Sequence, residues 1–251
     1  MRETNHGSRD TSVCRPGCET GIGGRQRGVS LVELMVALAI GLLVMAGMTR
    51  LFIEYQGIYR LQASLSRMQE DGRFALDVID RELRKAGYAP RTAPDAFPAG
   101  NGFAASASVA GDDHRLRVRY RGSTRAPLQN CLGGWVDRDA SGVTRFTVGD
   151  EPGLRCAVGD HSPQPLEHHV AAMAVRYFAA GRWRRAAGVG DWAAVTGVHV
   201  ELLLVSRQAG LLDAPQTYSF DGKAVTATDR RLRRVYATTV RLRNVPPETG
   251  T

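Results

Sequence analysis

An apolar run near the start of the chain, residues 29–49, is the strongest hydrophobic pattern in the sequence. The only charged residue in it is Glu33. A helix rises about 1.5 Å per residue, so the run spans roughly the 30 Å hydrocarbon core of a bilayer. It is too long for the apolar region of a typical signal peptide, and no small-residue cleavage site follows it. We therefore expect a membrane-spanning helix over residues 29–50.

The apolar pattern continues past this span with helical spacing. Steps of three and four residues predict that an amphipathic helix extends over residues 51–87 and packs against a sheet. Gly87 suits the position just past a helix end, and Pro90 forbids continuation. The expected apolar stripe consists of Leu51, Tyr55, Ile58, Leu61, Leu65, Met68, Leu76, Ile79 and Leu83. A coiled coil is the alternative for this half, but two internal glycines interrupt a short seam.

After the helix, the pattern changes to one that is typical of strands. Residues 88–113 are rich in proline and glycine, which indicates a loop. Leu116, Val118 and Tyr120 then alternate with arginines, which predicts a strand over 114–121 with one buried and one solvated face. Further strands are predicted at 144–148, 170–178, 197–206 and 234–242, with 197–206 in a central position. Strands that follow one long helix predict an α+β fold with an antiparallel β-sheet domain over 88–251.

The chain is basic, with a formal net charge of +8, and almost all of the excess is arginine. A basic balance raises the question of nucleic acid or anionic lipid partners. The arginines are scattered, with only short clusters at 182–185 and 230–234. A solvated basic face is therefore the preferred interpretation, and nucleic acid is not an expected partner.

The residues at the start of the apolar run form a specific arrangement. A basic leader ends at Gly28, an apolar Val29 follows, and Glu33 comes one helical turn later. A carboxylate within a membrane helix costs a few kcal/mol or more unless it finds a partner. A cut after Gly28 would give Val29 a positively charged amine within reach of Glu33, in the same chain or a neighbour. An ordinary anchor with a stray glutamate is the alternative, but it does not require these residues at these offsets.

This segment, Gly28-Val29-Ser30-Leu31-Val32-Glu33, resembles the class III signal of type IV prepilins. The resemblance implies cleavage by a prepilin peptidase between Gly28 and Val29, N-methylation of Val29, and a role for Glu33 in filament assembly. Val29 departs from the usual phenylalanine or methionine. The implied organisation is a leader peptide over 1–28, a transmembrane or filament-core helix over 29–50, its amphipathic continuation over 51–87, and a periplasmic β-rich pilin domain over 88–251.

Two further segments are similar to PilW-type minor pilins of the type IV pilus. One is Arg-Glu-Leu-Arg-Lys-Ala-Gly-Tyr at 81–88, at the end of the long helix, and the other is the final strand at 233–244. The resemblance implies a type IV pilin-like fold: a long N-terminal helix, membrane-spanning in its first half, packed on an antiparallel β-sheet domain. The implied function is a minor pilin that helps to initiate or prime pilus assembly and enters the filament near its tip.

The resemblance also implies partners and a location. The partners are the prepilin peptidase, other minor pilins, the major pilin and the inner membrane. The location is first the inner membrane, as a single-pass protein with a periplasmic C-terminal domain, and then the pilus filament at the cell surface. Two alternatives remain: a minor pseudopilin of a type II secretion system, and a tip pilin that binds DNA or surfaces.

Four cysteines divide between the leader and the expected domain. Cys14 and Cys18 would be removed with the leader, while Cys131 and Cys156 would face an oxidising periplasm. A pair of cysteines in that compartment favours a disulfide. Closing a loop of about 25 residues would contribute roughly 3–4 kcal/mol in the chain-entropy model. Two free buried thiols are the alternative.

The sequence does not contain a recognisable enzyme site. No serine or cysteine lies in a nucleophile signature, and no lysine follows Gly188-Val-Gly190 as a phosphate loop would require. We therefore expect neither catalysis, nor a cofactor, nor a small-molecule substrate.

Two segments have features of metal loops. Asp137, Asp139 and Ser141 alternate as in a calcium loop, but Val148 stands where a bidentate glutamate is needed, so a polar turn is preferred. The second segment contains Asp160, His161, Glu167, His168 and His169. Adjacent histidines on an extended segment point in opposite directions, so a surface loop is preferred there. No metal site is therefore expected.

Overall fold

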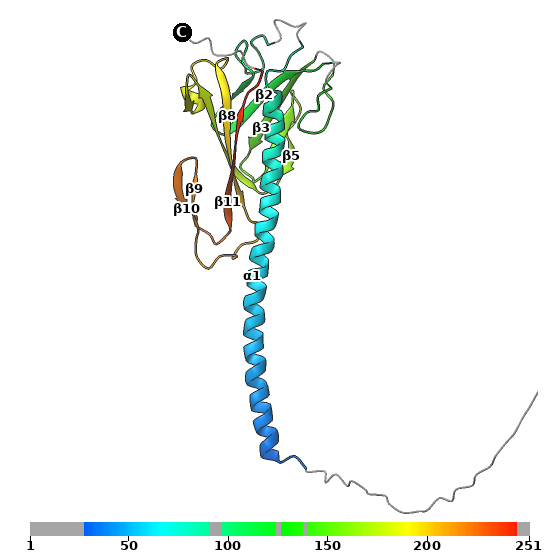
Figure 1. The fold of residues 1–251 in the computed structure, drawn as a ribbon, viewed down its shortest axis with the longest axis vertical. Coiled ribbons are helices and arrows are strands. Elements are labelled where there is room, and N and C mark those ends of the chain that lie inside the picture. The colour runs from blue at the N-terminus through cyan, green and yellow to red at the C-terminus, as the bar shows by residue number, and fades with distance from the viewer. Residues whose placement is uncertain (1–27, 91–96, 124–126, 138–139, 245–251) are drawn as a thin grey trace, which may run out of the picture. The chain divides into compact units, whose positions relative to one another are not determined.

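The computed structural model describes residues 28–90, 97–123, 127–137 and 140–244 (Figure 1). The chain forms two compact units, Met1–Phe52 and Ile53–Thr251, and each is described by itself. The leader with Cys14 and Cys18 lies outside the described residues, apart from Gly28. Asp139 of the calcium-like segment also lies outside them.

Helix α1, Leu31–Lys85, is one continuous helix of 55 residues that begins in the first unit and ends in the second. In the first unit, every described residue is exposed, including a long series of apolar side chains. By length and composition, α1 is the one helix among the described residues that is apolar enough to cross a membrane. The structure therefore agrees with the expectation of an apolar helix that is long enough to cross a membrane.

In the second unit, the buried face of α1 begins later than the apolar stripe predicts. Tyr55 and Ile58 are 68% and 56% exposed, whereas Leu61 and Leu65 are partly buried. The expectation that the whole stripe packs on the sheets is wrong for Leu51, Tyr55 and Ile58, because the core contacts of α1 begin only at Leu61. The fully buried positions are Met68, Gly72, Ala75, Val78, Ile79, Glu82 and Leu83.

The end of α1 follows the chemistry of its last residues. Gly87 has a φ of 72°, which glycine adopts without steric cost and which is common just past a helix end. Its N–H donates to the carbonyl of Arg119 at 3.0 Å. A Cβ at this position would lie 2.7 Å from the carbonyl oxygen of Asn244. Glycine thus both ends the helix and admits the chain that follows β11.

The first sheet has five antiparallel strands in the order β1-β2-β3-β4-β5. The strands are β1 Val109–Gly111, β2 Arg115–Arg121, β3 Ser141–Val148, β4 Leu154–Val158 and β5 Gln164–Glu167. Alternating burial along β2 and β3 turns one face of this sheet toward the core. Leu116, Val118 and Tyr120 are fully buried, as the alternation predicted.

The second sheet has four antiparallel strands in the order β11-β8-β6-β7, and a separate hairpin pairs β9 with β10. The elements are β6 Val170–Ala179, β7 Arg182–Arg184, η1 Ala186–Gly188, β8 Val195–Val205, β9 Thr217–Phe220, β10 Lys223–Thr226 and β11 Arg233–Arg241. Strand β8 lies between β6 and β11, so its predicted central position is confirmed. The last turns of α1 lie alongside β3 and β11 (Figure 1).

The prediction that the arginines of β2 face solvent is wrong for Arg119, because this residue is only 4% exposed. The chain before β1 folds over this face of β2, and the rings of Phe97 and Phe103 lie 5.1 and 4.8 Å from the guanidinium carbon. The guanidinium donates to the carbonyls of Phe97, Pro98, Ala104 and Ala107. Burial lowers the pKa of Arg119.

Gly72 allows α1 and β11 to approach closely. A Cβ at Gly72 would lie 2.6 Å from Cδ2 of Tyr236 on β11, which is closer than any van der Waals contact allows. By contrast, a Cβ at Gly57 on the same helix would meet no atom within 4 Å. Gly72, which interrupts the apolar stripe, therefore leaves the space in which the ring of Tyr236 packs against α1.

We expect Gly72→Ala to lower the free energy of unfolding by about 1–3 kcal/mol, because the added methyl overpacks the contact with Tyr236. Gly57→Ala is the matched control, and its gain in helix propensity is expected to stabilise the chain by up to about 1 kcal/mol. Chemical denaturation of the detergent-solubilised chain measures both variants. Equal stabilisation by the two substitutions would contradict the packing role of Gly72.

Candidate functional site

The N-terminal segment places the predicted processing site in accessible backbone. Gly28, Val29 and Ser30 precede the helix and are exposed, and the side chain of Val29 is 70% exposed. The N–H of Leu34 donates to the carbonyl of Ser30 at 3.0 Å, which starts the helical hydrogen bonding. The bond between Gly28 and Val29 therefore lies outside the helix, in exposed backbone.

Glu33 lies in the first turn of α1, where it is the only acidic residue. The free N–H groups of a helix start favour a carboxylate at this position. Val29 lies two residues before the helix begins and four positions before Glu33. The carboxylate of Glu33 therefore lies at the N-terminal end of an otherwise apolar segment.

The predicted partners Cys131 and Cys156 are joined by a disulfide, with their Cα atoms 6.5 Å apart. Cys156 lies on β4 and is fully buried, whereas Cys131 lies in the loop between β2 and β3. The bond ties this loop to the core of the first sheet. Leu132 and Trp135 in the same loop are exposed, at 42% and 65%.

A buried charged group, which sequence reasoning missed, connects the end of α1 to the first sheet. Glu82 is only 2% exposed and accepts a hydrogen bond from the hydroxyl of Thr144 on β3 at 2.9 Å. Lys85, one turn along the helix, donates to Glu82 and to the carbonyl of Gln129, and lies over the ring of Tyr120. The helical spacing of apolar residues gives no signal for this contact, because 62 residues separate Glu82 from Thr144.

Burial raises the pKa of the Glu82 carboxyl above its ordinary value of 4.5, although Lys85 and the hydrogen bonds lower it in part. The folded chain therefore holds this proton at pH values where the unfolded chain has lost it. The contribution of Glu82 to the free energy of unfolding is therefore fully present below pH 4.5. It is lost as the pH rises from 4.5 through the raised pKa.

We expect Glu82→Gln to reduce the fall in unfolding free energy that accompanies a rise in pH above 4.5. Asp77→Asn is the control, because Asp77 is an exposed carboxylate on the same helix, paired with Arg81. Urea denaturation at a series of pH values, from about 4 to about 8, compares the slopes. Identical slopes for Glu82→Gln and the parent chain would contradict the raised pKa.

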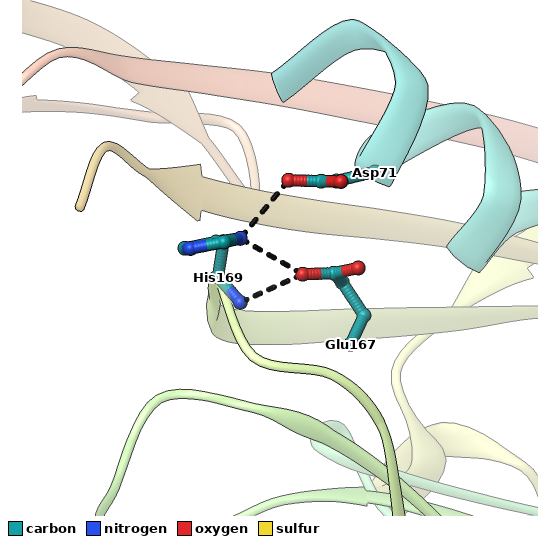
Figure 2. Close-up of side chains that lie close together, drawn as sticks. All are labelled: Asp71, Glu167 and His169. Carbon is teal, nitrogen blue, oxygen red and sulfur yellow. Dashed lines mark hydrogen bonds and ion pairs between the residues drawn. The ribbon is translucent and has the colours of Figure 1, made fainter. Parts of the chain in front are cut away.

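The histidine-rich segment contributes to a three-residue cluster (Figure 2). His169 Nδ1 lies 2.9 Å from Asp71 Oδ2 and 2.9 Å from Glu167 Oε1. Asp71 comes from α1, while Glu167 ends β5 and His169 precedes β6. The neighbouring His168 is exposed and is not part of the cluster, in agreement with the opposite directions predicted for adjacent histidines.

The other predicted metal-like features are not brought together in this cluster. Asp160 and His161 do not join it, and Asp137 is exposed. Asp71 was missed by sequence reasoning because it lies 98 residues before His169 and belongs to a helical pattern. Spacing within one segment cannot detect a ligand that a distant helix supplies.

Comparison with known proteins gives two family matches. Residues 135–244 match the family described as type IV pilus-assembly protein W. Residues 23–49 match the prokaryotic N-terminal methylation motif. No curated protein matches the chain in sequence.

Among solved structures, a type IV-like pilin from Thermus thermophilus is similar to this chain. Its TM-score is 0.49 and its sequence identity 18%, over 72% of this chain and 100% of that chain.

One long, apolar N-terminal helix, whose later turns pack on antiparallel sheets, defines an α+β protein. The chain thus contains a segment similar to the N-terminal methylation motif and a domain similar to the type IV pilus-assembly protein W family. The same features support anchoring in a membrane and association with the pilus.

Proposed function

We propose that the chain is a minor pilin that helps to initiate or prime type IV pilus assembly and enters the filament near its tip. One observation supports this above all: a prepilin-like signal and an exposed apolar helix precede a domain that matches the PilW family. The apolar half is suited first to a membrane and then to a filament core. The folded domain is suited to selecting neighbouring subunits.

Maturation is the first step of the proposed mechanism. The basic leader keeps the N-terminus on the cytoplasmic side of the inner membrane, in line with the positive-inside rule. The prepilin peptidase cuts between Gly28 and Val29, and Val29 is N-methylated. The amine of Val29 then pairs with a glutamate equivalent to Glu33, within one subunit or between neighbours.

Helix association is the second step. Small residues let membrane helices approach each other closely. The apolar part of α1 contains Ala37, Ala39, Gly41, Ala46 and Gly47. A Cβ at Gly41 or Gly47 would meet no atom within 4 Å, so both glycines are free for close contact with a neighbouring helix. Other minor pilins and the major pilin are the proposed neighbours, and the sheet domain is periplasmic before assembly.

A deletion strain tests this function. Surface pili are counted in a strain that lacks the gene, and secretion by the type II system is measured in the same strain. Loss of pili with normal secretion, restored by the wild-type gene, supports the minor pilin. Normal pili with failed secretion would contradict it and assign the chain to the pseudopilins of the secretion system.

A further inference from the structure

We propose that Asp71, Glu167 and His169 bind a divalent transition metal ion of the zinc class, which links α1 to the turn between β5 and β6. This inference concerns the second unit alone and is independent of the proposed role in pilus assembly. It rests on the geometry of Figure 2 and on the chemistry of the three side chains.

The three donor atoms converge on one point. His169 Nδ1 lies 2.9 Å from an oxygen of each carboxylate, and all three atoms lie within 4.8 Å of one another. Zinc bonds to histidine nitrogen and carboxylate oxygen are about 2.0–2.2 Å long, so ligand atoms of a tetrahedral site lie about 3.3 Å apart. The two distances from Nδ1 to the carboxylate oxygens are shorter than this by a few tenths of an ångström, so a small outward movement of the imidazole makes room for the ion.

Hydrogen bonding satisfies this cluster only in part. Nδ1 carries at most one proton, so it donates to only one of the two carboxylates at a time. Glu167 also accepts from the backbone N–H of His169 at 3.1 Å, whereas Asp71 contacts His169 through the ring nitrogen Nδ1. A cation in place of the proton can bind both carboxylates at once. The two negative charges of the carboxylates then balance the charge of a divalent ion.

The surroundings of the cluster admit an ion and its remaining ligands. Asp71 and His169 line a cavity of about 270 Å³, together with Ser64, Ser206 and other residues. The side chains of His169, Asp71 and Glu167 are 21%, 26% and 13% exposed. Three protein ligands leave room for water, as in other zinc sites with an open position.

Arg207 is the group that must adjust when metal binds. Its Nε donates to His169 Nε2 at 3.3 Å, which requires a lone pair on Nε2. A metal on Nδ1 moves the proton to Nε2, so this contact breaks. Arg207 is exposed and returns to water, as does the exposed Arg67 that also lines the cavity. Imidazole with two carboxylates suits zinc better than calcium or magnesium, which prefer sites made only of oxygen.

The test uses the full chain in detergent, stripped of metal with a chelator and titrated with zinc chloride in a calorimeter. We expect one zinc ion per chain and a rise in Tm on binding. Magnesium chloride at the same concentration is expected to have no effect. Absence of zinc binding by the parent chain would overturn the proposal.

Two variants locate the site. His169→Ala is expected to weaken zinc binding at least tenfold, as even the loss of a residue that supports a metal ligand can do. His168→Ala is the matched control, because it removes the adjacent exposed histidine and leaves the cluster intact. Equal binding by the two variants would overturn the proposal. Glu167→Gln repeats the measurement with a shape-conserving change if His169→Ala does not fold.

Discussion

Glu33→Ala is expected to leave cleavage after Gly28 largely intact and to lower the amount of the chain in filaments at least tenfold. The reason is electrostatic: without the carboxylate, the amine of Val29 enters an apolar core with no opposite charge. Removing one partner of a buried ion pair costs about 3–5 kcal/mol, which exceeds the roughly 1.4 kcal/mol that corresponds to tenfold. Immunoblots of membranes and sheared filaments measure the two effects separately.

Glu54→Ala is the control for this experiment. Glu54 is an exposed carboxylate on the same helix, but it lies beyond the expected membrane span. Its replacement is expected to leave both cleavage and incorporation unchanged. If the Glu33→Ala variant enters filaments in normal amounts, that result would contradict the proposed pairing of Glu33 with the amine of Val29.

The second large effect is expected from the disulfide. Replacing both Cys131 and Cys156 by alanine is expected to lower the free energy of unfolding by about 3–4 kcal/mol, because the 25-residue separation leaves a long loop unconstrained in the unfolded chain. Chemical denaturation of the oxidised parent chain and of the double variant measures the difference.

Reducing agent supplies the control for the double variant. It is expected to destabilise the parent chain by a similar amount and to leave the double variant unchanged. A difference of less than about 1 kcal/mol between the oxidised parent and the variant would show that the bond contributes little to stability.

Much of the fold was predictable from local pattern. The length of α1, the glycine after its end and the positions of β2, β3, β6, β8 and β11 all follow from hydrophobic spacing and turn chemistry. These elements are long or strongly alternating. The short strands β1, β4, β5, β7, β9 and β10 were not predicted, because three to five residues carry too little pattern to distinguish a strand from a loop.

Charged groups in the core were not predictable in the same way. Arg119 alternates like its solvated neighbours, but a loop that precedes it in the chain supplies carbonyls for its guanidinium. Glu82 and Asp71 read as ordinary helix residues, yet each contacts a residue more than sixty positions away. Only the three-dimensional arrangement of the second unit brings such partners together.

The most direct test of the central claim is the mass of the chain recovered from sheared surface filaments. We expect a chain that begins at Val29 and carries the mass of one added methyl group at its N-terminus. A chain found only in membranes, with residues before Val29 still attached, would contradict both the maturation and the incorporation proposed here.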